Sequence, residues 1–361
     1  VPSLVSFPFS FTIILSLFIS AKTNIYVLGV GSVVATASQL VLCIPFLRKT
    51  GYTHRRILDF RDRDMKEMIF IALPVIVGTA VNEINVLVNR TLASGIAEGG
   101  ISALNYANRL NGFVQGLFVV SVTTVLYPMI SRMAAEGNMK SLKAYLAEAI
   151  SMVNLFVIPA TAGAMVFARE IVTLLFGRGA FTVEAVNMTA SSLFYYSLGM
   201  VAFGLRDVLT RAFYALQDTR TPMINATIAV VINIVLNIVM SRFLGIGGLA
   251  LATSISGIIS ALLMFITLRK RIGPFGLKEI TTSFVKIAGA SMLMGIVAYI
   301  SFRFFRLFVS QNVALLAAIA VGALIYGILI LFMRIPEVDR TVESVKRRIR
   351  KRFVSTIEPE N

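Results

Sequence analysis

The stretch NVALLAAIAVGALIYGILILFM, residues 312–333, contains no charged side chain. As a helix it would be about 33 Å long, enough to cross the hydrocarbon core of a bilayer. Backbone amides and carbonyls in lipid must find partners within their own element, so we predict a membrane-spanning helix here. A membrane β-barrel would instead show short strands of alternating hydrophobicity, which this sequence lacks.

Similar apolar stretches recur along the whole chain. Hydrophobic residues make up 57% of it and charged residues 14%, with a mean hydropathy of +0.82, which is far outside the range of a soluble domain. We therefore predict an all-α polytopic membrane protein with about ten spans. The predicted spans are 3–20, 25–47, 67–93, 102–131, 142–168, 183–214, 222–243, 247–268, 279–302 and 312–333.

The basic residues are distributed unevenly between the loops. Alternate loops, beginning with 48–66 and ending with 334–352, carry 24 of the 34 Lys and Arg residues. The positive-inside rule places these loops and the C-terminus in the cytoplasm, so the net charge of +16 reflects topology rather than nucleic-acid binding. The basic cytoplasmic tail, 334–361, fits an amphipathic helix on the inner leaflet and a solvated tail equally well.

Catalytic chemistry finds no support in the sequence. The one histidine, His54, lies in a loop, and the one cysteine, Cys43, lies in a predicted span. No Ser/His/Asp set or metal-ligand spacing occurs, so we predict no enzyme, no cofactor and no metal. No GxxxxGK[ST] stretch is present, so we expect no nucleotide partner. We predict an external turn over 169–182, with Thr182 capping the next helix.

Arg109 is the strongest indication of function, because it lies inside the predicted span 102–131. An arginine at membrane depth costs several kcal/mol unless protein, water or a ligand surrounds it. Helical periodicity places Ser102 and Asn105 on the same face as Arg109, in line with two glycines. Alternatively, the arginine reaches up to the headgroups from a helix end.

The preceding span adds further polar side chains to this hairpin. They are Asn82, Asn85 and Asn89 on one face, with Glu83 and Arg90 beside them. These side chains either join helices by hydrogen bonds or line a hydrated cavity in which Arg109 meets an anionic group. We favour the cavity, because helix packing rarely needs so many polar groups on one hairpin. Glu83 and Arg90 are then candidates for charge balance or ion coupling.

Several stretches resemble the MurJ (MviN) family of lipid II flippases, within the superfamily of multidrug, oligosaccharidyl-lipid and polysaccharide exporters. They are Ala93-Ser94-Gly95, Tyr106-Ala107-Asn108-Arg109-Leu110, the turn from Phe176 to Thr182, and Arg211 to Pro222. The resemblance implies a MATE-like exporter architecture in which this chain corresponds to the last ten helices, with the first four missing. It also implies that Arg109 and Ser102 belong to a central cavity.

The resemblance further implies a division into domains. Residues 1–47 are the end of an incomplete N-terminal lobe, 48–66 a cytoplasmic amphipathic linker, 67–271 a six-helix C-terminal lobe, 279–333 two additional helices that line a groove for a lipid tail, and 334–361 the tail.

The family implies a multi-pass flippase of the bacterial cytoplasmic membrane. Its substrate is lipid II, an undecaprenyl-pyrophosphate-linked glycopeptide, moved by alternating access and driven by an unidentified ion gradient or by the membrane potential. In this chain Arg109 would contact the diphosphate. The alternatives are a flippase for another polyprenyl-linked glycan, a multidrug exporter, or a truncated membrane scaffold that transports nothing.

Overall fold

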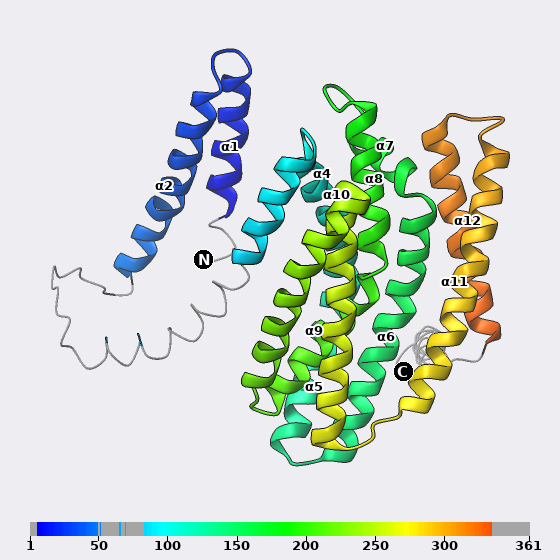
Figure 1. Cartoon of the computed structure of the whole chain (residues 1–361). Helices are drawn as coiled ribbons and strands as arrows, with labels where there is room; N and C mark the ends of the chain where they lie inside the picture. The colour runs from blue at the N-terminus through cyan, green and yellow to red at the C-terminus, as the bar shows by residue number, and fades with distance from the viewer. Residues whose placement is uncertain (1–5, 50, 52–64, 66–68, 70–82, 334–361) are drawn as a thin grey trace, which may run out of the picture. The chain divides into compact units, whose positions relative to one another are not determined.

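The computed structural model describes residues 6–49, 51, 65, 69 and 83–333. All regular secondary structure in these residues is helical, as Figure 1 shows. The chain divides into two compact units, Val1–Ala72 and Leu73–Asn361, which we call unit 1 and unit 2.

Unit 1 contains a hairpin of two apolar helices, α1 (Ser6–Ser20) and α2 (Tyr26–Lys49). The helices are in close contact where Gly31 meets Ser16: a Cβ atom built on Gly31 would lie 2.1 Å from the Ser16 hydroxyl oxygen. That hydroxyl donates to the carbonyl of Thr12, 2.8 Å away, so it is satisfied within its own helix. Small residues at such a contact are typical of membrane helices, which associate through close packing.

Unit 2 is a bundle of helices joined by short turns (Figure 1). Its described helices are 83–96, α4 (Gly100–Val114), η2 (Gln115–Val119), α5 (Val120–Ala135), α6 (Met139–Val166), α7 (Ala168–Phe176), α8 (Val183–Ser197), α9 (Met200–Ala215), α10 (Arg220–Ile272), α11 (Leu277–Phe305) and α12 (Gln311–Phe332).

Polar side chains cap the N-termini of two of these helices. The side chain of Asn138 accepts a hydrogen bond from the Ser141 amide at 3.1 Å before α6, and Thr182 accepts one from the Ala185 amide at 3.2 Å before α8. Each bond satisfies one of the free amides in a first helical turn. The predicted cap at Thr182 is therefore confirmed.

Three irregularities interrupt the long helices of unit 2. The helix η2 is a single π-helical stretch between α4 and α5. The helices α8 and α9 meet at a bend of 49°. Within α10, Gly245 has φ 56° and ψ −133°, a conformation that breaks the helix into two parts and that glycine adopts at little cost.

The predicted fold class is confirmed. Six helices in the described residues are long and apolar enough to cross a membrane, or seven if α8 and α9 form one span, and α10 covers both 222–243 and 247–268. Of the predicted span 67–93, the structure describes the helix from residue 83 onward. Most of the linker 48–66 and the whole tail 334–361 lie outside the described residues, and the domain boundaries stay predictions.

The external turn predicted over 169–182 is shorter than expected. The helix α7 occupies the first part, with the acidic residue Glu170 in its first turn, where it interacts favourably with the helix dipole. Ala168 and Val172 are buried one turn apart, so one face of α7 packs into the bundle. The glycine turn from Gly177 to Thr182 is present, and the helix before it was not predicted because α7 is too short to register as a separate apolar stretch.

The core of unit 2 is apolar and continuous through α4 to α10. Among its fully buried side chains are Leu142, Leu193, Leu209 and Phe213. Two smaller clusters attach α11 and α12 to this bundle, one around Ile287 and one around Phe167. In lipid such contacts stabilise the bundle through close packing rather than through exclusion of water.

Two hydrogen bonds reinforce the attachment of the last helix. The Tyr326 hydroxyl of α12 donates to the carbonyl of Leu155 in α6 at 2.6 Å. The Lys286 ammonium of α11 donates to the carbonyl of Met333 at 3.0 Å, which places a positive charge at the C-terminal end of α12. A cation at this end is favoured by the helix dipole.

Candidate functional site

A polar cavity of about 520 Å³ lies within unit 2, between the helix 83–96, α4, η2 and α8 to α10. Its most frequent lining groups are carboxamides. They belong to Asn85, Asn89, Asn108, Asn111, Gln115 and Asn233. Arg206 is the only charged side chain on the described lining of this cavity.

Two smaller polar cavities share lining residues with the first. One, of about 120 Å³, is lined by Arg90 and Asn105 and shares Asn89 and Asn108 with the large cavity. The other, of about 270 Å³, shares Arg206 with it and also has hydroxyl-bearing side chains on its lining. The described lining of each cavity contains an arginine and no carboxylate.

Several carboxamides of the large cavity have no partner in the protein. The side-chain oxygens of Asn85, Asn89 and Asn111 are buried and accept no hydrogen bond from the described residues. A buried polar group without a protein partner requires water or a ligand, because leaving it unsatisfied costs about 1–3 kcal/mol. The cavity therefore suits polar contents.

Other polar residues near the cavity serve the fold. The Asn237 amide donates to the Asn233 side-chain oxygen at 2.9 Å, and the Asn233 amide donates to the Thr253 hydroxyl at 3.4 Å. The second bond joins the two halves of α10, and the first lies within the half before Gly245. Their spacing of four residues, which places both on one face of a helix, is the one signal for these two asparagines in the sequence, since no charged residue lies within four positions of either in the predicted span 222–243.

The polar face predicted on the span 102–131 exists as a stripe along α4 and η2. Ser102, Asn105, Arg109, Gly112 and Gly116 are all exposed within unit 2. No heavy atom lies within 4 Å of a Cβ atom built on either glycine. The stripe therefore borders open space in this unit.

The structure separates the predicted residues of the preceding helix. Asn85 lines only the large cavity, Arg90 lines the cavity of about 120 Å³, and Asn89 lines both. Glu83 is exposed and lines neither these three polar cavities nor the apolar cavity described below, and the same holds for Ser102 and Arg109. Asn82 lies outside the described residues.

Residues that the sequence analysis did not select complete the cavity wall. Asn108, Asn111 and Gln115 follow α4 into η2, and Arg206 comes from α9. Their grouping depends on helices that are about a hundred residues apart in the chain. The one available signal was Arg206 itself, a further arginine within a predicted span.

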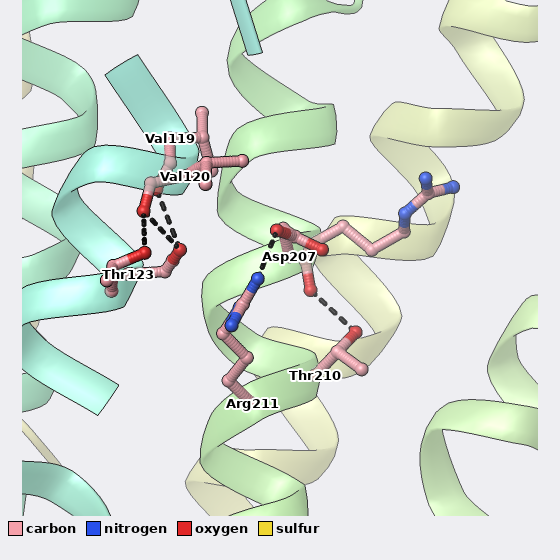
Figure 2. Close-up of polar contacts among 8 residues, drawn as sticks. Val119, Val120, Thr123, Asp207, Thr210 and Arg211 are labelled. Atoms are coloured by element: carbon pink, nitrogen blue, oxygen red, sulfur yellow. Dashed lines mark hydrogen bonds and ion pairs between the residues drawn. The ribbon is translucent and has the colours of Figure 1, made fainter. Parts of the chain in front are cut away.

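Asp207 and Arg211, one helical turn apart on α9, form an ion pair, which Figure 2 shows beside η2. The Arg211 guanidinium lies 3.5 Å from the Asp207 carboxylate and 5.9 Å from the centre of the Tyr127 ring. In the same view the Thr123 hydroxyl contacts the carbonyls of Val119 and Val120, at 2.9 and 3.1 Å. These contacts support the chain where η2 returns to α-helix.

The π-helical stretch and the bend between α8 and α9 are linked directly. The Gln115 side chain of η2 donates to the carbonyl of Met200, the first residue of α9, at 2.8 Å. On the other side of the bend, the Ser254 hydroxyl of α10 contacts the carbonyls of Tyr195 and Tyr196, at 2.7 and 3.3 Å. Side chains thus satisfy carbonyls that the bend exposes.

A polar cluster joins the two ends of α10. Asp218 accepts hydrogen bonds from the Thr221 amide at 2.9 Å and from the Thr221 hydroxyl at 2.8 Å, and it forms an ion pair with Arg271. Burial alone would raise the pKa of the Asp218 carboxyl, but the Thr221 hydrogen bonds and the Arg271 charge outweigh it and hold the pKa below its usual value.

An apolar cavity of about 610 Å³ lies on the other side of α4, next to α11 and α12. Phe113, Phe156 and Phe167 line one part, and Leu315 and Tyr326 of α12 line another. Its walls suit hydrocarbon rather than polar groups.

Comparison with known proteins connects this architecture to a family. A family described as Lipid II flippase MurJ matches residues 1–319. The probable lipid II flippase MurJ of Vibrio cholerae is 35% identical over 268 residues, which cover 73% of this chain and 51% of that protein. The corresponding protein of Thermotoga maritima is 30% identical over 269 residues, 74% of this chain and 52% of that protein. The chain thus spans about half the length of these curated relatives.

Solved structures agree. A lipid II flippase MurJ in an inward closed conformation has a TM-score of 0.78 and 29% identity, covering 92% of this chain and 67% of that one. The Vibrio cholerae MATE transporter VcmN in its bent form has a TM-score of 0.51 and 16% identity, covering 78% of this chain and 64% of that one, and it shares the fold.

The helices and polar cavities therefore define a multi-pass α-helical membrane protein with the architecture of MATE transporters. The family match over residues 1–319 and the sequence identity to the relatives narrow this class to one family. The chain belongs to the lipid II flippase MurJ family.

Proposed function

We propose that this chain belongs to a flippase that moves lipid II across the bacterial cytoplasmic membrane by alternating access. One observation carries the proposal: an exposed polar stripe centred on Arg109 runs beside cavities whose described charged lining residues are arginines. Arginines without carboxylates favour an anionic ligand, and the lipid II headgroup carries a diphosphate.

Each part of the site has a place in this function. Arg109 contacts the diphosphate through charge-assisted hydrogen bonds, with Ser102 and Asn105 beside it. Asn85 and Asn89, with Asn82, provide polar contacts for the sugar and peptide, which agrees with the unpartnered oxygens of the first two. Glu83 and Arg90 balance charge or couple transport to an ion.

Part of the undecaprenyl chain occupies the apolar cavity of about 610 Å³ beside α11 and α12, whose aliphatic and aromatic lining suits hydrocarbon. The predicted extra helices 279–333 thus separate the tail from the headgroup. This arrangement keeps a long apolar chain in an apolar environment while the charged headgroup crosses between leaflets.

The orientation in the membrane follows the positive-inside rule, with the C-terminus in the cytoplasm. Transport takes no nucleotide, nucleic acid or cofactor as a partner and performs no chemistry on the lipid. The energy comes from an ion gradient or from the membrane potential, which contributes about 2.3 kcal/mol per charge per 100 mV.

The cavities favour this function over multidrug export. A drug exporter that binds cations requires a carboxylate at the site, and the described lining of the polar cavities has none. A flippase for another polyprenyl-linked glycan would use the same diphosphate contacts. Direct competition between lipid II and other polyprenyl-linked sugars for binding distinguishes the two.

Replacing Arg109 tests the proposal. In a bacterium depleted of its own lipid II flippase, the gene that carries this chain is expected to restore growth, and its Arg109→Ala variant is expected to fail while reaching the membrane in equal amounts. Loss of charge-assisted hydrogen bonds corresponds to at least about a tenfold loss of transport. Arg109→Lys is expected to be impaired as well, because lysine cannot bind diphosphate through two parallel hydrogen bonds.

The matched control is Arg132→Ala. Arg132 is exposed at the end of α5 and pairs with Glu136 at 2.8 Å, so its loss is expected to leave growth intact. Normal growth with Arg109→Ala would contradict the role of Arg109 in transport.

A further inference from the structure

Building on the function proposed above, we propose that Arg206 is a second binding residue for the anionic groups of the transported headgroup. It lies on α9, about a hundred residues from Arg109 in the chain, and faces the cavities rather than the exposed stripe. The anionic group it contacts is a phosphate or a carboxylate, since both present oxygens that match a guanidinium.

The position of Arg206 between two cavities is the first argument. It lines both the cavity of about 520 Å³ and the adjoining one of about 270 Å³, and no other charged residue belongs to the described lining of either. A cation on a cavity lining that holds no carboxylate creates a positive potential there, which attracts anions.

The depth of Arg206 is the second argument. It lies nine residues before Ala215, the last residue of α9, which corresponds to about 14 Å along the helix. In a bilayer core of about 30 Å this is near the middle. An arginine is retained at such depth only where a cavity, water or a counter-charge surrounds it.

Arg206 forms no ion pair among the described residues, although the Asp207 carboxylate next to it in the chain is near enough to act on its charge. The neighbouring carboxylate, Asp207, pairs with Arg211 instead, at 3.5 Å. The contact that the structure gives the Arg206 guanidinium is the ring of Phe203, 5.7 Å from its centre. A cation–π contact orients the group without neutralising it, so its hydrogen-bond donors remain available for a ligand.

The surroundings suit an anion. Asn108, Asn111 and Gln115 line the large cavity with carboxamides, and Thr210 and Ser260 line the second cavity with hydroxyl groups. The carboxamides and the Ser260 hydroxyl can donate hydrogen bonds to phosphate or carboxylate oxygens, whereas the Thr210 hydroxyl already donates to the Arg206 carbonyl at 2.7 Å. Arg206 supplies the charge, and these neutral side chains supply directional contacts.

Binding measurements on the purified full chain test the proposal. The probes are undecaprenyl pyrophosphate, which carries phosphate without peptide, muramyl pentapeptide, which carries carboxylates without phosphate, and undecaprenol, which carries neither. Arg206→Gln is expected to weaken binding of one or both anionic probes about 10- to 100-fold and to leave undecaprenol unchanged. The matched control is Arg211→Gln, on the same helix but on none of the cavity linings, and it is expected to change binding less than about twofold.

The outcomes separate this proposal from the proposed function. If Arg109→Ala weakens binding of undecaprenyl pyrophosphate and Arg206→Gln affects no anionic probe, Arg206 has no binding role and the proposed function stands. If the unmodified chain binds neither anionic probe, both proposals fail. Equal weakening of all three probes by Arg206→Gln would assign this residue to the fold and overturn its role in binding.

Restoring a positive charge at position 206 by chemical modification tests the binding role of Arg206 independently of the Arg206→Gln variant. Cys43 is the only cysteine, so Arg206→Cys in a Cys43→Ser background carries a single thiol. Reaction of that thiol with a cationic aminoethyl methanethiosulfonate is expected to recover at least about a third of the lost affinity for the anionic probe, whereas a sulfonate reagent of similar size is expected to recover none. Equal effects of both reagents would overturn the proposal.

Discussion

At the residue scale, the chain keeps arginines at membrane depth and treats them in two ways. Arg211 is neutralised by Asp207 one turn away on the same helix, which is the pattern of a structural pair. Arg109 and Arg206 have no ion pair among the described residues and border open or polar space. The presence or absence of a counter-charge therefore separates structural arginines from candidate binding arginines.

The charge of Asp218, in contrast, stabilises the fold. Its hydrogen bonds from Thr221 and its ion pair with Arg271 connect the start of α10 to its end. The folded state therefore lowers the pKa of the Asp218 carboxyl, which means that the cluster stabilises the fold above the unfolded pKa of about 3.9. This stabilisation is lost as the pH falls through the folded-state pKa.

We expect Asp218→Ala to destabilise the protein at pH 7 by about 1 kcal/mol, the usual contribution of a helix-capping side chain. Thermal unfolding in detergent measures the difference from the unmodified chain, which should shrink as the pH falls below about 4 because both proteins then lack the charge. The control is Glu136→Ala, which removes a carboxylate whose ion pair with Arg132 is exposed on both sides. We expect this variant to leave the stability almost unchanged. A difference that stayed constant down to pH 3 would rule out the ionised carboxylate as its source.

At the element scale, the irregular parts of unit 2 meet at one place. The π-helical stretch η2 and the bend between α8 and α9 are joined by the Gln115 side chain, which also lines the polar cavity. π-helical stretches are rare and occur often at functional sites. The bend is thus held next to the polar cavity by side chains of η2 and α10.

We expect Gln115→Leu to lower the stability of unit 2 by about 1 kcal/mol, because the hydrogen bond to the Met200 carbonyl is lost. The matched control is Asn108→Leu, which also places an apolar side chain on the cavity but breaks no hydrogen bond within the described residues. Melting temperatures in the same detergent measure both. Equal melting temperatures for the two variants would show that the link across the bend contributes nothing.

The elements themselves were largely predictable from the sequence, because each apolar stretch must satisfy its own backbone in lipid. The polar face of α4 was also predictable, since Ser102, Asn105 and Arg109 follow the helical period. The cavity wall was not, because Gln115 and Arg206 come together only through the packing of α9 against η2. The short helix α7 was missed because it does not cross the membrane and leaves no long apolar signal.

At the scale of the whole molecule, the distribution of charge makes a prediction about sidedness. The turn at residue 136 precedes α6, and the turn at residue 178 follows α7. The helix α6 has 28 residues and is about 42 Å long, longer than the hydrocarbon core, so the two turns lie on opposite sides of a membrane. The positive-inside rule places the first in the cytoplasm and the second outside.

Labelling of single thiols tests this orientation. In a Cys43→Ser background, Arg178→Cys and Glu136→Cys each add one exposed thiol to a turn. A reagent that cannot cross the cytoplasmic membrane is expected to label Arg178→Cys in intact cells and to label Glu136→Cys only after the membrane is opened. Labelling after opening serves as the control for expression of both variants. The reverse labelling pattern would show that the orientation is opposite to the predicted one, with the basic loops outside. The transport direction proposed for lipid II would then be wrong.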